Sequence, residues 1–84
     1  MDKKTIEKIC KINELLSGLS IDVNLVAIDK DNEEYQFNSI LMDGDVIYLG
    51  DFCHIDEFHW SIYLENVVSI GFKKCGKLIR VDVL

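Results

Sequence analysis

The first nineteen residues carry apolar side chains at steps of three and four, the repeat of one face of an α-helix. The stripe consists of Ile6, Ile9, Cys10, Ile12, Leu15, Leu16 and Leu19. Asp2 is suited to cap the first turn, and Gly18 is suited to follow the last turn in a left-handed conformation. The pattern predicts a helix from about residue 3 to residue 17. Its apolar face must be covered by the rest of the domain or by another subunit.

After Gly18 the spacing changes to an alternation of apolar and polar positions, which is typical of half-buried β-strands. We predict strands at 21–28, 35–42, 46–49, 58–64, 67–72 and 78–84. Asp43-Gly44 is the strongest hairpin signal and predicts a type I′ turn, in which both central residues have positive φ. Glu65-Asn66 interrupts the alternation between two core strands and predicts a tight corner there.

These elements predict one domain over residues 1–84, because a chain of this length has no room for a second domain. Residues 1–18 are assigned to the N-terminal helix and residues 20–84 to an antiparallel sheet. The predicted fold class is α+β and mostly β: a helix followed by a small antiparallel β-barrel of five to six strands.

The segment Ile62-Tyr63-Leu64-Glu65-Asn66-Val67-Val68-Ser69-Ile70 resembles the second signature of Sm-like proteins. The resemblance implies a bent, SH3-like barrel, subunits joined edge to edge in rings, and RNA bound in the pore. Tyr63-Leu64 stands where that family has the Arg-Gly that faces RNA. The family's Asp-x-x-x-Asn signature is missing around residues 41–46. The resemblance therefore bears on the fold more than on the function.

Charge is distributed unevenly along the chain, which has a formal net charge of −6. Residues 19–66 hold eleven of the fifteen acidic residues and one of the nine basic residues. This balance disfavours nucleic acid as a partner, because phosphate binding requires clustered Lys and Arg, and favours a basic protein or a second copy of the chain. The lysine-rich, proline-free composition is typical of a low-GC bacterium or its phage.

The sequence contains no apolar run long enough to cross a bilayer, and its first residues lack the apolar core of a signal peptide. We therefore expect a cytoplasmic protein that makes no membrane contact. Three widely spaced cysteines, Cys10, Cys53 and Cys75, predict free thiols rather than a disulfide framework.

The densest group of potential metal ligands lies at residues 51–59. Cys53 and His59 could share a face with Asp51 and Glu57, whereas His54 and Asp56 would face the other way. The spacing matches no zinc motif, so we predict no metal and no cofactor. Cys53 beside a histidine is the one candidate for a nucleophile, and no third group that could orient the base is apparent. We therefore predict no enzymatic activity.

Of the aromatic residues, Phe37, Phe58, Trp60 and Phe72 are expected in the core. Tyrosine is enriched at interfaces, and the acidic residues gather in the predicted loops. The sequence thus predicts a small acidic protein-interaction module, able to self-associate. Its expected contact residues are Asp43, Asp45, Tyr48, Asp51, Asp56, Glu57 and Tyr63. Two alternatives stay open: an acidic, phage-encoded decoy that mimics nucleic acid and inhibits a host nucleic-acid-binding protein, and an Sm-like RNA-binding protein.

Overall fold

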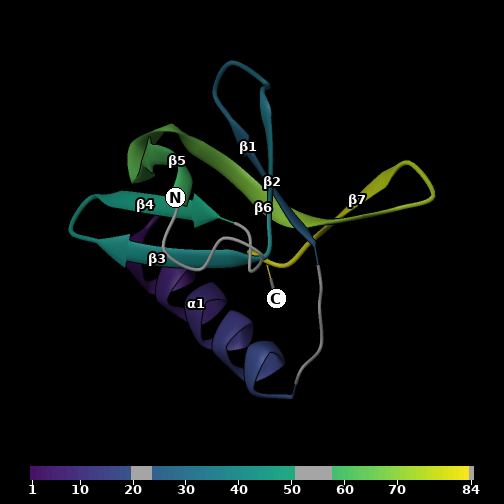
Figure 1. The fold of residues 1–84 in the computed structure, drawn as a ribbon. Helices are drawn as coiled ribbons and strands as arrows, with labels where there is room; N and C mark the ends of the chain where they lie inside the picture. The colour runs from purple at the N-terminus through teal and green to yellow at the C-terminus, as the bar shows by residue number, and fades with distance from the viewer. Residues whose placement is uncertain (20–23, 51–57, 84) are drawn as a thin grey trace.

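The computed structural model describes residues 1–19, 24–50 and 58–83. One helix precedes the strands, as Figure 1 shows, and a 3-10 turn joins the fifth strand to the sixth. The elements are α1 (Lys3–Gly18), β1 (Leu25–Asp29), β2 (Glu34–Phe37), β3 (Ser39–Asp43), β4 (Val46–Gly50), β5 (Phe58–Tyr63), η2 (Leu64–Asn66), β6 (Val67–Lys74) and β7 (Lys77–Arg80).

Helix α1 begins where the sequence predicts. The Thr5 amide donates a 2.8 Å hydrogen bond to the Asp2 carboxylate, and Thr5 lowers the pKa of Asp2 through these bonds. The helix continues through Gly18, which does not have a positive φ, so the prediction of a left-handed glycine there is wrong. Within the described ranges, no helix is long and apolar enough to span a membrane.

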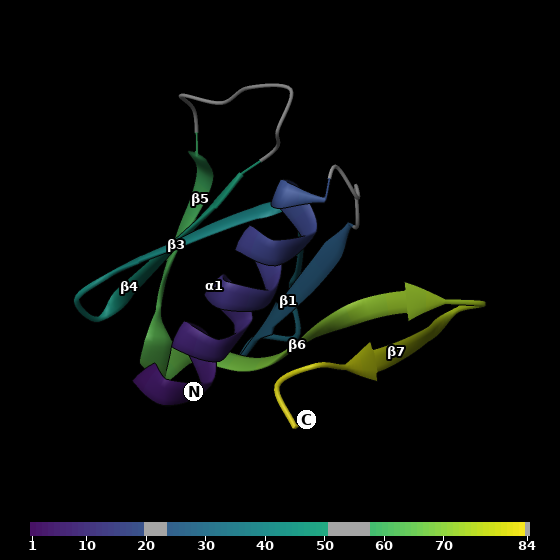
Figure 2. The ribbon, with the colours of Figure 1, turned by 90° about the horizontal axis from the view of Figure 1, so that it is seen from below.

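The described strands form two antiparallel sheets, so the fold is α+β and mostly β. One sheet has the order β2-β1-β6-β7 and the other the order β3-β4-β5. Seven strands are present in the described part of the chain, and they do not close into the barrel that the sequence predicts. In two views the β6–β7 hairpin extends away from the rest of the molecule (Figures 1 and 2).

Asn38 is the corner between the two sheets. The single strand predicted at 35–42 is instead two strands, because the chain leaves β1 after Phe37 and pairs with β4 from Ser39 onward. The phase of burial changes at the same point: Phe37 is buried before Asn38, and Ile40 after it. The side-chain amide of Asn13, on α1, donates a buried 2.8 Å hydrogen bond to the Asn38 carbonyl. The helix thus satisfies a polar group that the corner removes from water.

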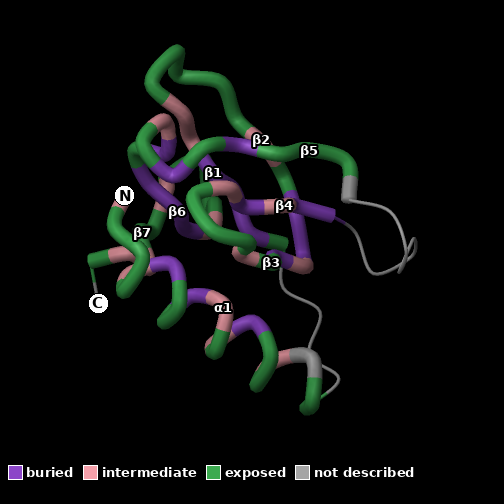
Figure 3. The backbone as a smooth tube through the Cα atoms, turned by 90° about the vertical axis from the view of Figure 1, so that its left-hand side faces the viewer, coloured by how far each residue is buried: buried purple, intermediate pink, exposed green. Residues whose placement is uncertain are grey.

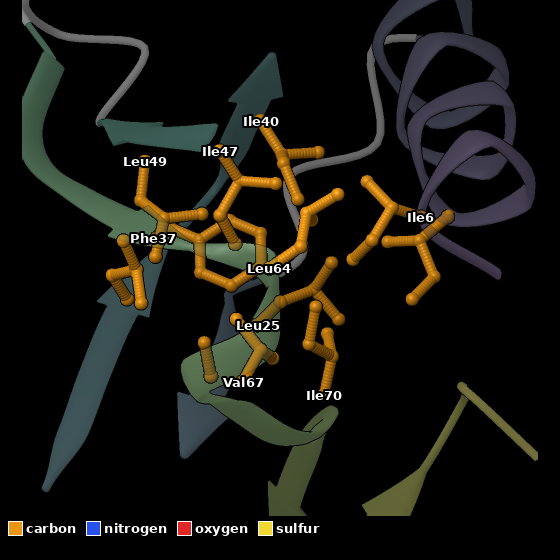
Figure 4. Packing of buried hydrophobic residues seen from close by; sticks show 12 residues of the cluster. Ile6, Leu25, Phe37, Ile40, Ile47, Leu49, Leu64, Val67 and Ile70 are labelled. Atoms are coloured by element: carbon orange, nitrogen blue, oxygen red, sulfur yellow. The ribbon is translucent and has the colours of Figure 1, made fainter. Parts of the chain in front are cut away.

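The core lies between the two sheets and under the first half of α1. Its side chains point toward one another from α1, both sheets and η2 (Figure 4). The most deeply buried large residues are Ile6, Ile9, Ile47, Leu49 and Ile70. The burial-coloured trace shows one buried side along α1 and exposed residues along its other side (Figure 3). Each of these buried side chains contributes about 1.5–3 kcal/mol through the hydrophobic effect.

Strand β7 approaches β6 most closely at Gly71. A Cβ atom on this glycine would lie 2.1 Å from the backbone oxygen of Ile79. Beyond β7 the chain stays on β6: the Val81 amide donates a 2.8 Å hydrogen bond to the Ile70 carbonyl, and the Ile70 amide donates one of 3.1 Å to the Asp82 carboxylate. The strand predicted at 78–84 therefore ends at Arg80, and the residues after it hold the hairpin against the sheet.

Burial raises the pKa of Asp82, but its hydrogen bonds outweigh burial and leave the pKa below its ordinary value. The donors are the guanidinium of Arg80, whose Nε lies 3.2 Å from the carboxylate, and the amide of Ile70. Asp82 is therefore ionised and satisfied in the folded chain.

The hairpin predicted at Asp43-Gly44 is confirmed in place, but its turn type differs. Asp43 pairs with Val46, which makes Gly44 and Asp45 the central residues. Only Gly44 has a positive φ, of 62°, which is the φ pattern of a type II′ turn rather than the predicted type I′. The β6–β7 turn has positive φ at both Cys75 and Gly76 and has the type I′ φ pattern instead.

Candidate functional site

Four of the seven residues predicted from the sequence to make contacts lie on the β3–β4–β5 sheet or its turn. These are Asp43, Asp45, Tyr48 and Tyr63. The other three, Asp51, Asp56 and Glu57, lie outside the described residues. All of the predicted contact residues that the structure describes therefore lie on or beside the same sheet.

Strand register places six side chains on the outer side of this sheet. One row across the strands joins Asp43, Val46 and Tyr63, and the next joins Leu41, Tyr48 and Ser61. Residues directly opposite each other in antiparallel strands share a face, and the alternate rows contain buried Ile40, Leu49, Ile47 and Ile62. We call the six residues of the two outer rows the outward face.

The outward face exposes large apolar and aromatic side chains to solvent. Leu41 is 52% exposed and Tyr63 is 59% exposed, while Val46 and Tyr48 are half-buried. Asp43 is its one charged residue. Apolar and tyrosine side chains with a carboxylate at the margin are typical of protein-binding surfaces. Leu41 and Val46 were missed by sequence reasoning, which chose residues by type and did not know the phase of the strand after Asn38.

Asp45 connects the margin of this face to the start of the chain. Its carboxylate lies 3.3 Å from Lys3 Nζ, and its carbonyl accepts a 2.8 Å hydrogen bond from the Leu64 amide. The Met1 ammonium donates to the carbonyls of Leu64, at 2.8 Å, and Val67, at 3.2 Å. A hollow of about 520 Å³ opens here, lined by Met1, Asp2, Lys3, Asp45, Tyr63, Leu64 and Glu65. The ion pair is exposed, so it orients Asp45 without adding much stability.

The described carboxylates of the acidic middle lie on two different hairpins, except Glu65, which lies in η2. Asp29, Asp31, Glu33 and Glu34 belong to the β1–β2 hairpin, and Asp43 and Asp45 to the β3–β4 hairpin. These hairpins point in different directions (Figure 1). Asp22, Asp51, Asp56 and Glu57 lie outside the described residues, so the mimicry of nucleic acid stays a prediction.

The β1–β2 turn is built around Asp29. Its carboxylate accepts hydrogen bonds from the amides of Asp31 and Glu33, at 2.9 and 3.0 Å, and from the Tyr35 hydroxyl, at 2.7 Å. The bond from Tyr35 is the main cause of a lowered pKa at Asp29, and the same bond raises the pKa of the Tyr35 phenol. Asp29 thus serves the turn as a structural acceptor.

The metal ligands considered in the sequence lie almost entirely outside the described residues; His59 is the exception. It is exposed, and its ring lies 5.5 Å from that of Trp60. No group of three or more His, Cys, Asp or Glu side chains suited to a metal is present in the part of the chain that the structure describes. Cys10 and Cys75 are free; burial raises the pKa of the Cys10 thiol, and Glu14 adds to the effect.

Helix α1 leaves the second half of its apolar face open. Leu15 is 68% and Leu19 69% exposed, whereas Ile6 and Ile9 are buried. The same helix also borders a cavity of about 340 Å³ on the β6–β7 side of the sheet, lined by Ile9, Ile12, Leu16, Leu25, Phe72 and Val81. Every lining residue is apolar. The rest of the domain therefore covers only the first half of the helix stripe.

Comparisons of this chain with protein-family models, with curated proteins and with solved structures find no significant match. The protein is thus a small α+β, mostly-β domain with two exposed apolar faces: the outward face and the second half of the α1 stripe.

Proposed function

We propose that this chain is a small protein-interaction module that acts by binding rather than by catalysis, with the outward face as its contact surface. The observation that carries the proposal is the pairing register, which brings Leu41, Tyr48 and Tyr63 onto one side of a three-stranded sheet. A rigid sheet presents such side chains at little entropic cost on binding.

The partner that suits this face is a protein surface with an apolar centre and a basic margin. Asp43 lies at one end of the outward face, Asp45 follows in the turn, and no Lys or Arg belongs to the face. The net charge of −6 would also steer a basic protein toward the chain. Charge at the margin sets orientation and association rate, while the apolar centre supplies most of the affinity.

Truncating the outward face should abolish capture of the partner. We expect the double variant Leu41→Ser, Tyr63→Ser, immobilised and exposed to lysate of the cells that make the protein, to recover its specific partner at least about tenfold less than the unmodified chain, because tenfold corresponds to only about 1.4 kcal/mol. Quantitative mass spectrometry of the bound proteins measures this ratio.

The matched control is Val68→Ser, because Val68 is an exposed apolar residue of the other sheet. It should retain capture, and all variants should keep the thermal transition of the unmodified chain. Proteins that are lost with the double variant alone are outward-face partners, and they should be basic and leave the beads at high salt. If no protein is lost selectively, the proposal is wrong.

We also propose that the chain self-associates through the second half of α1. Leu15 lies on α1 and Leu19 directly follows it, and Ile12 and Leu16 of the same helix line the apolar cavity. A twofold axis pairs one patch with an identical patch, so a face that carries both projecting leucines and a recess can complement itself. The second copy is therefore the occupant that we assign to this face.

Leu15→Glu should weaken that dimer at least about tenfold, because it places a carboxylate at the centre of the apolar contact. Sedimentation equilibrium over a range of concentrations measures the dissociation constant. Val68→Glu adds the same charge at an exposed apolar position of β6 and should leave the constant unchanged. A strict monomer of the unmodified chain at millimolar concentration would contradict self-association.

We further propose that the fold is related to the small, bent β-barrels of Sm-like and SH3-like proteins. Three features support it: a near-continuous strand bent at Asn38, the corner η2 between β5 and β6, and the pairing of β6 with β1. In this chain β7 pairs with the other edge of β6. That edge is therefore not open for pairing with a neighbouring subunit.

A further inference from the structure

A second recess lies on the side of the molecule where β2 and β5 approach each other. It has a volume of about 380 Å³ and is lined by Asn24, Gln36, Phe37, Asn38, His59 and Trp60. None of its lining residues is Lys, Arg, Asp or Glu. Aromatic rings and neutral amides therefore form its walls, and we call it the Trp60 cleft.

Trp60 occupies an inward position of its strand but is not buried. Its row across the sheet also contains Ile40 and Leu49, which are both buried, whereas Trp60 is 39% exposed. The expectation that Trp60 belongs to the core is thus wrong. A large aromatic side chain that faces inward and still meets water marks a place where the fold is open to a ligand.

The ring of Trp60 is held by two aromatic neighbours. Tyr35 lies edge to face with it, at 5.9 Å between ring centroids and an angle of 68°, and His59 lies at 5.5 Å and 56°. Tyr35 is fixed in turn, because its hydroxyl donates to Asp29 at 2.7 Å and is 3.1 Å from Glu33. The acidic β1–β2 turn therefore fixes Tyr35, and Tyr35 in turn holds the ring of Trp60 in place.

We propose that the Trp60 cleft binds an arginine side chain of a partner protein, an inference that rests on the proposed function because it names the chemistry of that partner. The electron-rich faces of Trp and Tyr rings attract cations, and Trp does so most strongly. The guanidinium is planar, stacks on aromatic rings and is less hydrated than an ammonium group. Its N–H groups can donate to the exposed side-chain amides of Asn24 and Gln36.

The charges around the cleft distinguish arginine from a nucleobase. Stacking of nucleic acid requires basic residues that follow the backbone. The hydroxyl of Tyr35 instead contacts two carboxylates, Asp29 and Glu33. This negative charge attracts a guanidinium and repels a phosphate.

Trp60 is the only tryptophan of the chain, so its fluorescence reports directly on the cleft. The probe is a blocked five-residue peptide with one central arginine among glycines and serines. We expect saturable changes in Trp60 emission with this peptide, at least about tenfold weaker binding of the same peptide with citrulline, which has the shape of arginine without its charge, and intermediate binding with lysine.

Variants assign the binding to the cleft, with polarisation of a labelled peptide as the measurement. Trp60→Leu should weaken arginine binding at least about tenfold, and Trp60→Phe by a few-fold, because the phenyl face attracts cations less strongly. Tyr63→Ser, on the outward face, should leave binding unchanged. A thermal transition for each variant verifies folding, and peptide binding by Trp60→Phe keeps the test valid if Trp60→Leu does not fold.

Equal binding of the citrulline peptide, or undiminished binding by Trp60→Leu, would overturn the proposal. So would a short oligothymidylate that changes Trp60 emission where the arginine peptide does not, because it would make the cleft a nucleobase site. Failure here is separate from failure of the proposed function, because partner capture is tested with Leu41 and Tyr63 and arginine binding with Trp60.

Discussion

Gly71→Ala should strongly destabilise this chain, although it adds only one methyl group. The added Cβ would lie 2.1 Å from the Ile79 oxygen, 2.8 Å from the Ile79 carbonyl carbon and 2.9 Å from Arg80 Cα. All three are backbone atoms, so no side chain can move aside. Separation of β6 from β7 is the only relief, and we expect a loss of about 3 kcal/mol or more in the free energy of unfolding.

Thermal and urea unfolding measure this loss, which for a domain of this size lowers the melting temperature by roughly 15 °C. Gly18→Ala is the matched control, because a Cβ there meets nothing within 4 Å and Gly18 lies in the helix without a positive φ. It should stabilise the chain by up to about 1 kcal/mol. A Gly71→Ala variant as stable as the unmodified chain would contradict the close approach of β7.

Asn13→Ala should also destabilise the chain, though less than Gly71→Ala. Removing the amide leaves the Asn38 carbonyl without the 2.8 Å hydrogen bond from α1, in a buried place. A buried acceptor that loses its partner costs about 1–3 kcal/mol, and the better helix propensity of alanine offsets part of it. We expect a net loss of about 1–2 kcal/mol in urea unfolding.

Asn24→Ala removes the same amide from an exposed position and serves as the control. It should change the free energy of unfolding by less than about 0.5 kcal/mol. A loss at Asn13 no greater than that at Asn24 would mean that α1 does not support the corner. The comparison therefore separates this single contact from the general effect of removing an asparagine.

Features of the fold that depend on neighbouring residues were predictable from the sequence. The helix follows from its repeat of three and four, and Asp2 accepts the Thr5 amide as predicted. The hairpin at Asp43-Gly44 is in place because glycine supplies the positive φ that the turn needs. The turn type was wrong because the central residues are Gly44 and Asp45 rather than Asp43 and Gly44. Strand register decides this, and local sequence does not.

The break at Asn38 was not predictable from alternation. Before it the buried position is Phe37, and after it the buried position is Ile40, but apolar residues occur in both phases of 35–42. Which phase faces inward depends on the sheet to which each half pairs, a contact between distant residues. The same ambiguity hid Leu41 from the predicted contact residues. Trp60, by contrast, does occupy an inward position and is 39% exposed.

The contact residues that sequence reasoning did identify were chosen by residue type. Tyr48 and Tyr63 were selected because tyrosine is common at interfaces, and the register then placed them with Asp43 on one face. The bare half of α1 had a clear signal in the helix stripe. The domain covers part of that stripe, and the extent depends on how β6 and β7 pack. The helix pattern alone does not predict this packing.

The turn at Asn38 gives both sheets a common length of backbone. Straightening residues 37–39 would remove the pairs Leu25–Phe37 and Ser39–Gly50 together, one from each sheet. We therefore expect unfolding of one sheet to weaken the other at this shared stretch of backbone. A single cooperative unfolding transition, the same by probes of either sheet, is the expected behaviour of this eighty-four-residue chain.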